Sequence, residues 1–109
     1  MSYKILGQVY PSAVETLDEL YVVPASKETV CSTLTMCNQG TAADTVRVAV
    51  NVAGAAAATK SYIYYDLVIP AKETFATTIG IALATTDQIE VYSLLGTTSF
   101  NLFGNENDV

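Results

Sequence analysis

The sequence predicts an all-β fold, a single antiparallel β-sandwich or jelly-roll-like barrel of about seven or eight strands. Apolar and polar residues alternate with a period of two in several stretches, which is the pattern of strands with one buried face. Turn residues separate these stretches at intervals of roughly ten residues, a spacing typical of sandwiches. No helical segments alternate with the strands, which argues against a parallel α/β sheet. We therefore expect residues 1–109 to form a single β-sandwich domain.

The clearest strand pattern lies in residues 29–52, which we predict to be a hairpin and the centre of folding. Apolar residues of one parity run through both arms: Val30, Leu34 and Met36 in the first, and Val46, Val48, Val50 and Val52 in the second. Gly40 tolerates positive φ, and Asn38 and Asp44 can bond their own backbone, so residues 38–44 supply the turn. We expect the valine row to be core and the opposite face to be available to a neighbour. That face carries Thr33, Thr35, Arg47 and Asn51.

Shorter runs of β-prone residues predict the remaining strands. They cover residues 3–10, 20–23, 61–69, 73–83, 88–93 and 97–103. The alanine-rich residues 53–59 are too short for a stable helix and are predicted to be a loop. The last six residues, 104–109, are polar and acidic, and we expect them to form an exposed tail.

The segment before the second predicted strand leaves two alternatives open. Ser12 followed by Glu15 resembles a helix capping box, but the helical continuation is short. Residues 12–20 are therefore either a short helix or a loop that orders against the body of the protein. Together with the first strand, residues 1–20 form a possible extended N-terminal arm.

The predicted strand at residues 61–69 carries large side chains on both faces. Ile63, Tyr65, Leu67 and Ile69 share one face, and Tyr62, Tyr64 and Val68 share the other. One face should meet the core, and tyrosines on the other face suit a half-exposed contact. They either cover part of this subunit's own sheet or face a partner. The possible subunit contacts are Tyr62 and Tyr64, with Tyr21 and Tyr10 from the N-terminal part of the chain.

Composition restricts the class of partner. Only 15% of the residues are charged, against about 25% in a typical protein, so part of the surface is expected to pack against other subunits. The net charge is −6 and the five basic residues form no cluster, which argues against nucleic acid and against an anionic membrane. No apolar run reaches the roughly 18 residues that span a bilayer, and no signal peptide is recognisable. We expect a protein that is made and kept in a cytoplasm.

The sequence predicts no catalytic, cofactor-binding or metal site. It has no histidine, which argues against a zinc site and against a Cys-His nucleophile. Cys31 and Cys37 lie about 20 Å apart along a strand, whereas a disulfide needs Cα atoms within about 7 Å. Asp66 lies in mid-strand, where a carboxylate needs a partner, and Arg47 or Lys60 can supply one. We therefore expect no enzyme, no cofactor and no small-molecule substrate.

Two classes of function fit a small β-domain of this kind. One is a structural subunit that repeats itself in an assembly, which the low charge and the threonine- and alanine-rich surface favour. The other is a module that binds a ligand such as a sugar through its tyrosine face. The absence of tryptophan weakens the second class, since aromatic stacking usually carries carbohydrate binding.

Most of the chain resembles small virion structural proteins of tailed bacteriophages, including those of cyanobacteria. In that family an LY-x-VPA entry, a VVSSLxVCN strand, an RVAVxxAG strand, a YIxYD strand, an IPAxxT turn and an LATTDxIxVY turn and strand recur in this order. The matching stretches here are residues 20–25, 30–38, 47–54, 62–66, 69–74 and 83–92. Each motif alone is only β-propensity with turn residues, and the specificity lies in their order.

The resemblance implies a non-enzymatic virion component. We expect a capsid decoration or cement protein that lies on the outside of the head lattice and bridges neighbouring capsomers. Its partners are then the major capsid protein and itself, because a small domain reaches a standard interface more easily as a dimer or trimer. A tail, baseplate or head-tail connector subunit is the alternative location. The expected place is the capsid surface of the virion, after synthesis in the host cytoplasm.

Overall fold

Eight antiparallel strands form the protein in the computed structural model, which describes residues 2–109. The strands are β1 (Ser2–Val9), β2 (Leu17–Val22), β3 (Lys27–Asn38), β4 (Asp44–Asn51), β5 (Tyr62–Ile69), β6 (Thr74–Leu83), β7 (Gln88–Ser93) and β8 (Thr98–Asp108). Two short 3-10 turns, η1 (Val52–Gly54) and η2 (Thr59–Ser61), lie in the connection between β4 and β5. The described residues contain no α-helix.

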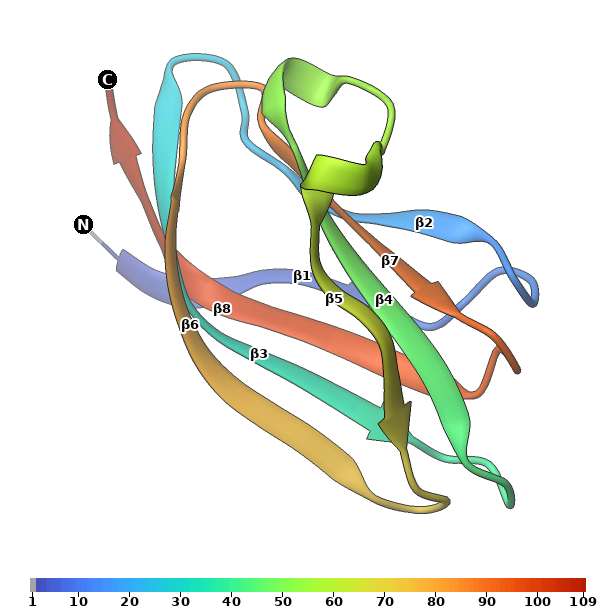
Figure 1. Cartoon of the computed structure of the whole chain (residues 1–109). Coiled ribbons are helices and arrows are strands. Elements are labelled where there is room, and N and C mark those ends of the chain that lie inside the picture. The colour runs from blue at the N-terminus through green and yellow to red at the C-terminus, as the bar shows by residue number, and fades with distance from the viewer. Residues whose placement is uncertain (1) are drawn as a thin grey trace.

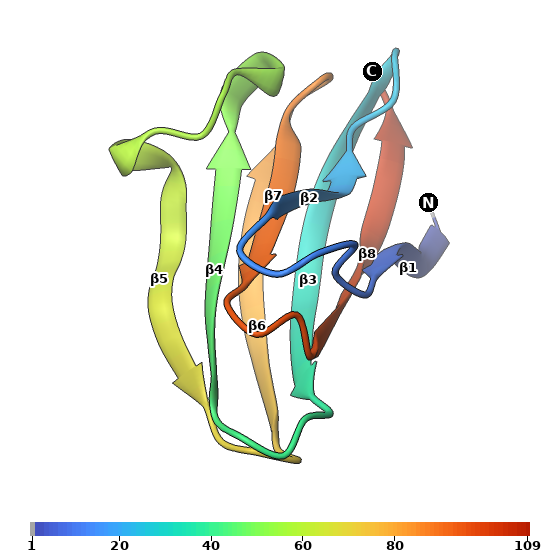
Figure 2. The same cartoon turned by 90° about the vertical axis from the view of Figure 1, so that its right-hand side faces the viewer.

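The strands form two four-stranded sheets that pack face to face (Figures 1 and 2). Sheet A has the order β1-β8-β3-β6, and sheet B has the order β2-β7-β4-β5. The pairs β1/β8, β2/β7, β3/β6 and β4/β5 are those of a jelly roll, in which one long antiparallel hairpin folds over on itself. The sheets stay open and do not close into a barrel. The predicted all-β sandwich is confirmed, with eight strands.

The core lies between the sheets and is built from alternate residues of each strand. The largest fully buried side chains are Phe100, Leu34, Met36, Ile69, Ile89, Leu102, Val23, Val46, Val48 and Val91. Because successive residues of a strand point to opposite faces, the intervening positions form the two outer faces of the sandwich.

The predicted hairpin at residues 29–52 is wrong as a pairing, although both of its arms are strands. β3 belongs to sheet A and β4 to sheet B, so the connection between them crosses from one sheet to the other. β3 pairs with β6 and β8, and β4 pairs with β5 and β7. Figure 2 shows this crossing at its lower end. The alternation reports which face is buried, but it does not report the partner strand.

Two of the residues predicted to be core, Val30 and Val52, are exposed. The cause is a bulge in β3 for Val30 and the end of β4 for Val52. The register of β3 shifts between Cys31 and Thr33 against both of its neighbours. An extra residue reverses the parity of the strand, so Val30 is 45% exposed while Cys31 is fully buried. In the valine row, Val46 and Val48 are buried, whereas Val52 lies in η1 and is 72% exposed.

The two ends of the chain are strands of sheet A and form neither an arm nor a tail. β1 pairs with β8 from Ser2 to Val9, so residues 1–20 do not extend away from the body over the described part. β8 continues through residues 104–108, where Gly104 and Asn105 are buried. A Cβ on Gly104 would lie 2.1 Å from the backbone oxygen of Val30. This glycine therefore permits close strand packing and does not end the strand.

Residues 12–20 contain no helix. The backbone N–H and the hydroxyl of Ser12 both donate to the carboxylate of Asp18, at 3.2 and 2.8 Å, and this holds a turn before β2. The capping-box alternative is therefore wrong, because Ser12 is bonded to the start of the following strand.

A buried polar network joins the connections at one end of the sandwich. Asp44 is fully buried and faces no cation, and its carboxylate accepts four hydrogen bonds. The donors are the backbone N–H groups of Thr45 and Leu95, at 2.8 and 2.9 Å, and the hydroxyls of Ser93 and Thr98. The bonds tie the start of β4 to the β7–β8 connection, which leads from sheet B to sheet A.

Asn38, at the end of β3, satisfies the neighbouring connections in the same way. Its Nδ2 donates to the carbonyl oxygens of Ala42, Ile69 and Pro70, and its Oδ1 accepts from the N–H of Gly40 and the hydroxyl of Thr97. The β3–β4, β5–β6 and β7–β8 connections therefore share one set of hydrogen bonds, which we call the Asn38–Asp44 network.

Replacing Asp44 by Asn should lower the free energy of unfolding by about 3 kcal/mol, because the hydroxyls of Ser93 and Thr98 lose their buried acceptor and must turn to accept from the new amide. Urea denaturation followed by circular dichroism measures the change. Asp108→Asn is the matched control, since the Asp108 side chain is 86% exposed and its loss should leave the midpoint unchanged. Equal midpoints for the two variants would show that the network does not hold the sheets together.

Candidate functional site

The outer face of sheet A is uncharged over most of its area. Its outward residues form cross-strand rows in the register of the four strands. Successive rows are Ser99, Cys37 and Thr74; Gln8, Asn101, Thr35 and Ala76; Ile5, Phe103, Thr33 and Thr78; and Tyr3, Asn105, Val30 and Ala82. No member of these rows is charged, although the whole chain carries a net charge of −6. The face is amide- and hydroxyl-rich at one end and more apolar at the other.

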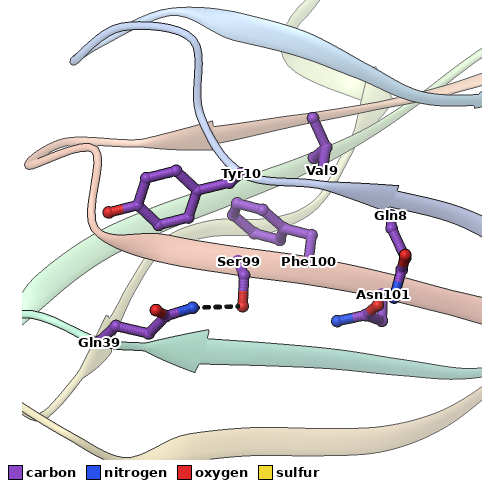
Figure 3. Close-up of a pocket in the computed structure, with 7 residues that line it drawn as sticks. All are labelled: Gln8, Val9, Tyr10, Gln39, Ser99, Phe100 and Asn101. Carbon is purple, nitrogen blue, oxygen red and sulfur yellow. Dashed lines mark hydrogen bonds between the residues drawn. The ribbon is translucent and has the colours of Figure 1, made fainter.

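A shallow hollow of about 480 Å³ lies at the amide-rich end of this face (Figure 3). Its polar lining comes from Gln8, Tyr10, Gln39, Ser99 and Asn101. Gln8 on β1 lies directly opposite Asn101 on β8, so both amides project from the same side of the ladder. Tyr10 follows the end of β1 and is 54% exposed.

The outer face of sheet B carries a stacked group of aromatic and arginine side chains. The guanidinium carbon of Arg47 on β4 lies 4.2 Å from the ring centroid of Tyr65 and 4.6 Å from that of Tyr92. Arg47 Nε also donates to Asp66 at 2.6 Å, and this hydrogen bond raises the pKa of Arg47. Of the two partners that the sequence offered to Asp66, Arg47 and Lys60, the structure selects Arg47, and Asp66 is half exposed and not buried.

A bulge in β5 decides which tyrosines join this group. Two residues, Tyr65 and Asp66, oppose Arg47 alone, and Asp66 has a φ of 57°. The bulge turns Tyr65 outward, where it is 59% exposed and makes an edge contact with Tyr62 at a centroid distance of 5.0 Å. We call Tyr62, Tyr65, Arg47 and Tyr92 the Tyr-Arg face.

The four predicted contact residues lie in different places. Tyr62 belongs to the Tyr-Arg face, and Tyr10 lies beside the outer face of sheet A. Tyr64 points inward and meets Phe75 edge to face at 5.6 Å. Tyr21 is 7% exposed and belongs to the core cluster. Tyr65, which the strand pattern assigned to the core side, takes the outward position that was expected of Tyr64.

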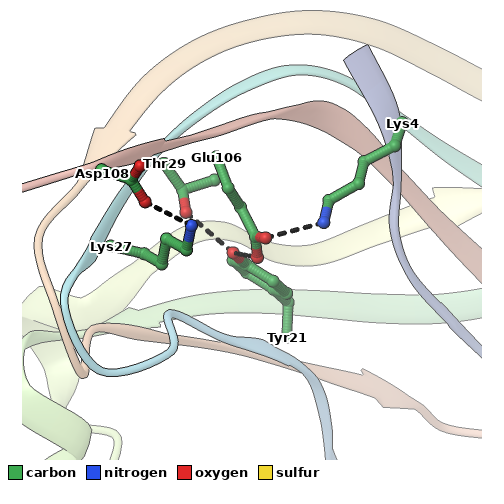
Figure 4. Close-up of polar contacts among 6 residues, drawn as sticks. All are labelled: Lys4, Tyr21, Lys27, Thr29, Glu106 and Asp108. Atoms are coloured by element: carbon green, nitrogen blue, oxygen red, sulfur yellow. Dashed lines mark hydrogen bonds and ion pairs between the residues drawn. The ribbon is translucent and has the colours of Figure 1, made fainter. Parts of the chain in front are cut away.

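The densest group of titratable residues lies at the opposite end from the Asn38–Asp44 network (Figure 4). Tyr21 donates its hydroxyl hydrogen to Glu106, and the hydroxyl of Thr29 lies 2.7 Å from the same phenol oxygen. Lys4 binds the other carboxylate oxygen of Glu106 at 2.7 Å. The hydrogen bonds from Lys4 and Tyr21 lower the pKa of Glu106, and burial raises the pKa of Tyr21.

This cluster joins β1, β2, β3 and β8. A tyrosine that holds its proton and a carboxylate already bonded to a lysine are poor acid-base catalysts. The arrangement is that of a structural network between the two sheets.

The remaining reactive groups are dispersed. Cys31 is buried, which raises the pKa of its thiol to about 12, and Cys37 is half buried on the outer face of sheet A. Both cysteines are free. Within residues 2–109, no three His, Cys, Asp or Glu side chains lie close enough to hold a metal ion. None of the described helical turns is long and apolar enough to cross a membrane.

Comparison of the chain with protein-family models, curated proteins and solved structures gives no match. The chemistry of the two outer faces and the order of the sequence motifs are therefore the features that bear on the function of this chain.

The Glu106 cluster makes stability depend on pH. A carboxylate whose pKa in the folded state is below its ordinary value of 4.5 stabilises the protein above that pH, and the stabilisation is lost as the pH falls through the folded-state pKa. Glu106→Gln should therefore unfold at a lower urea concentration than the unmodified protein at pH 7, and the two should converge in acid. Glu28→Gln, at an exposed position of the same sheet, should keep the unmodified midpoint at pH 7. A difference that persists unchanged in acid would contradict this assignment.

Proposed function

We propose that the protein is a non-enzymatic structural subunit of a tailed-phage virion. Within the virion we place it as a decoration, or cement, protein bound to the outside of the head lattice. The ordered motifs in residues 20–92 support this class of protein. The jelly-roll topology is compatible with it, since jelly rolls recur among viral capsid domains, although a fold by itself does not define a function.

The observation that carries the proposal is the Tyr-Arg face. Tyrosine and arginine are enriched in the energetically important centres of protein interfaces. Arg47 is fixed between two rings and bonded to Asp66, so binding a partner would restrict few additional rotamers. We infer that this face binds the major capsid protein.

The size of the chain favours association of copies. A standard interface buries about 800 Å² on each partner, and the whole accessible surface of this chain is 5618 Å². One outer face therefore supplies at most one such interface. A dimer or trimer would present several copies of the Tyr-Arg face to the lattice at once.

The apolar end of sheet A is the second surface available for this association. Tyr3 is 79% exposed and Ile5 54% exposed on the edge strand β1, beside the 45% exposed Val30 of β3. These side chains would bury apolar area between copies without opposing the net negative charges of the subunits. The acidic balance also disfavours DNA, as expected for a protein outside the shell.

The same face would also serve a tail, baseplate or connector subunit. The position of the chain in a virion map separates these locations from the head surface. Particles that lack the protein should form and then release DNA at a lower temperature if it is a cement. Density for the chain in the tail would overturn the decoration assignment and leave the structural role in place.

Tyr65→Ala should weaken binding to purified particles by about tenfold or more, the effect of removing a central aromatic contact. Co-sedimentation with particles that lack the protein measures it. Tyr10→Ala is the matched control, because Tyr10 is exposed to a similar extent, 54% against 59% for Tyr65, and lies by the other sheet. If Tyr65→Ala binds like the unmodified protein while Tyr10→Ala does not, the docking face is wrong.

A further inference from the structure

We propose that the hollow lined by Gln8, Tyr10 and Asn101 on the outer face of sheet A binds a neutral carbohydrate. The site is separate from the Tyr-Arg face and does not depend on the virion role. A subunit docked through sheet B would hold the outer face of sheet A away from the lattice, because the two faces lie on opposite sides of the sandwich (Figure 2).

The strand register places two amides and a hydroxyl side by side in one row next to the hollow. Gln8 and Asn101 are direct partners in the β1–β8 ladder, and Thr35 of β3 is the partner of Asn101 on its other side. Each amide offers two N–H donors and one acceptor oxygen, and the threonine hydroxyl offers one donor and two lone pairs. Adjacent hydroxyls of a sugar present the same alternation of donor and acceptor. The row is therefore suited to bind a pair of sugar hydroxyls.

Most of the polar side chains that line the hollow make no hydrogen bond within the protein. Gln39 Nε2 donates to Ser99 Oγ at 3.2 Å, as Figure 3 shows. Over residues 2–109, the side chains of Gln8, Tyr10 and Asn101 make no hydrogen bond to another protein group. Asn101 is held by strands on both sides and Gln8 by β8 on one side, so their amides are available to a ligand without disturbing the sheet.

An aromatic ring, that of Tyr10, lies at the rim of the hollow. Tyr10 follows β1 directly, and its ring lies along one side of the hollow in Figure 3. At 54% exposure it offers an apolar surface to the C–H groups of a sugar and keeps its hydroxyl in reach of solvent. The amides of the hollow can bind the hydroxyls of a pyranose, while the Tyr10 ring packs against its C–H groups.

The absence of charge selects the ligand class. None of the residues that line the hollow is charged. The rows that continue from it across sheet A are uncharged as far as Val30 and Asn105, and the next row carries Glu28 at the far end of the face. A phosphate, a sulfated sugar or a nucleic acid would find no cation among the lining side chains and would approach a chain of net charge −6. The cation at the rim, Lys72, already donates to the backbone oxygen of Gln39 at 3.0 Å. A neutral sugar can replace its hydrogen bonds to water by hydrogen bonds to these amides. The volume of about 480 Å³ lies within the range of about 300 to 1,000 Å³ of small-ligand sites.

The test is titration of the full-length, ¹⁵N-labelled protein with neutral oligosaccharides of glucose, galactose and N-acetylglucosamine, and with sialylated and sulfated oligosaccharides. We expect at least one neutral sugar to bind with a dissociation constant of about 1 mM, a value appropriate to a shallow site. The side-chain amide signals of Gln8 and Asn101 should shift with saturation. Failure of every neutral sugar to shift these signals, or binding of charged sugars alone, would overturn the proposal.

Variants locate the site. Asn101→Ala and Tyr10→Ala should each weaken binding by about tenfold, and Gln8→Ala, on the exposed edge strand, repeats the test without altering the centre of the sheet. Tyr65→Ala is the matched control and should bind the sugar like the unmodified protein. The same sugar-binding variants should still bind virus particles, so failure of the sugar site and failure of the virion role give different results. Sugar binding that survives both Gln8→Ala and Asn101→Ala would place the ligand elsewhere and contradict the proposal.

Discussion

The relative position of the two sheets depends on a buried carboxylate that has no cation beside it. Asp44 is fully buried, and its carboxylate oxygens accept hydrogen bonds from four donors. An ionised group in an apolar interior is costly unless its lone pairs are occupied, so these donors are a condition for the fold. They come from the start of β4 and from the β7–β8 connection, and this arrangement is possible only if the sheets meet at one distance. The Asn38–Asp44 network therefore fixes the sandwich, and with it the orientation of both outer faces.

Local patterning was sufficient to predict the strands and insufficient to predict their partners. The alternation of Ile89 and Val91 with Glu90 and Tyr92 defines β7 at the bounds that the structure has. A period of two reports that one face is buried, and any neighbouring strand with a buried face satisfies it. In a jelly roll the strand next in sequence is often in the opposite sheet, as β3 and β4 are. The hairpin prediction failed because it assumed that neighbours in sequence pair.

Bulges account for the errors in individual side chains. One extra residue near Ser32 exchanges the faces of Val30 and Cys31, and another at Asp66 sends Tyr65 outward while Tyr64 enters the core. No composition signal marks these positions, because a bulge is imposed by the register of the partner strands. The sequence therefore predicted a strand with tyrosines available for contact, and it predicted a basic partner for Asp66, either Arg47 or Lys60. It assigned the wrong tyrosine to the surface. The hollow of Gln8 and Asn101 was not predicted, because its members lie far apart in sequence and meet only through the β1–β8 register.

The two outer faces differ in chemistry in a way that separates their uses. The outer face of sheet B concentrates rings and a guanidinium that are already bonded to one another, so it is preorganised for a protein surface. The amide-rich end of sheet A has free polar groups and no charge, so it is poorly suited to a strong protein contact and well suited to a hydroxyl-rich ligand. Packing one face against a lattice leaves the other toward solvent, because both belong to a single rigid sandwich. A subunit bound through sheet B, as proposed, would therefore present the outer face of sheet A to solvent.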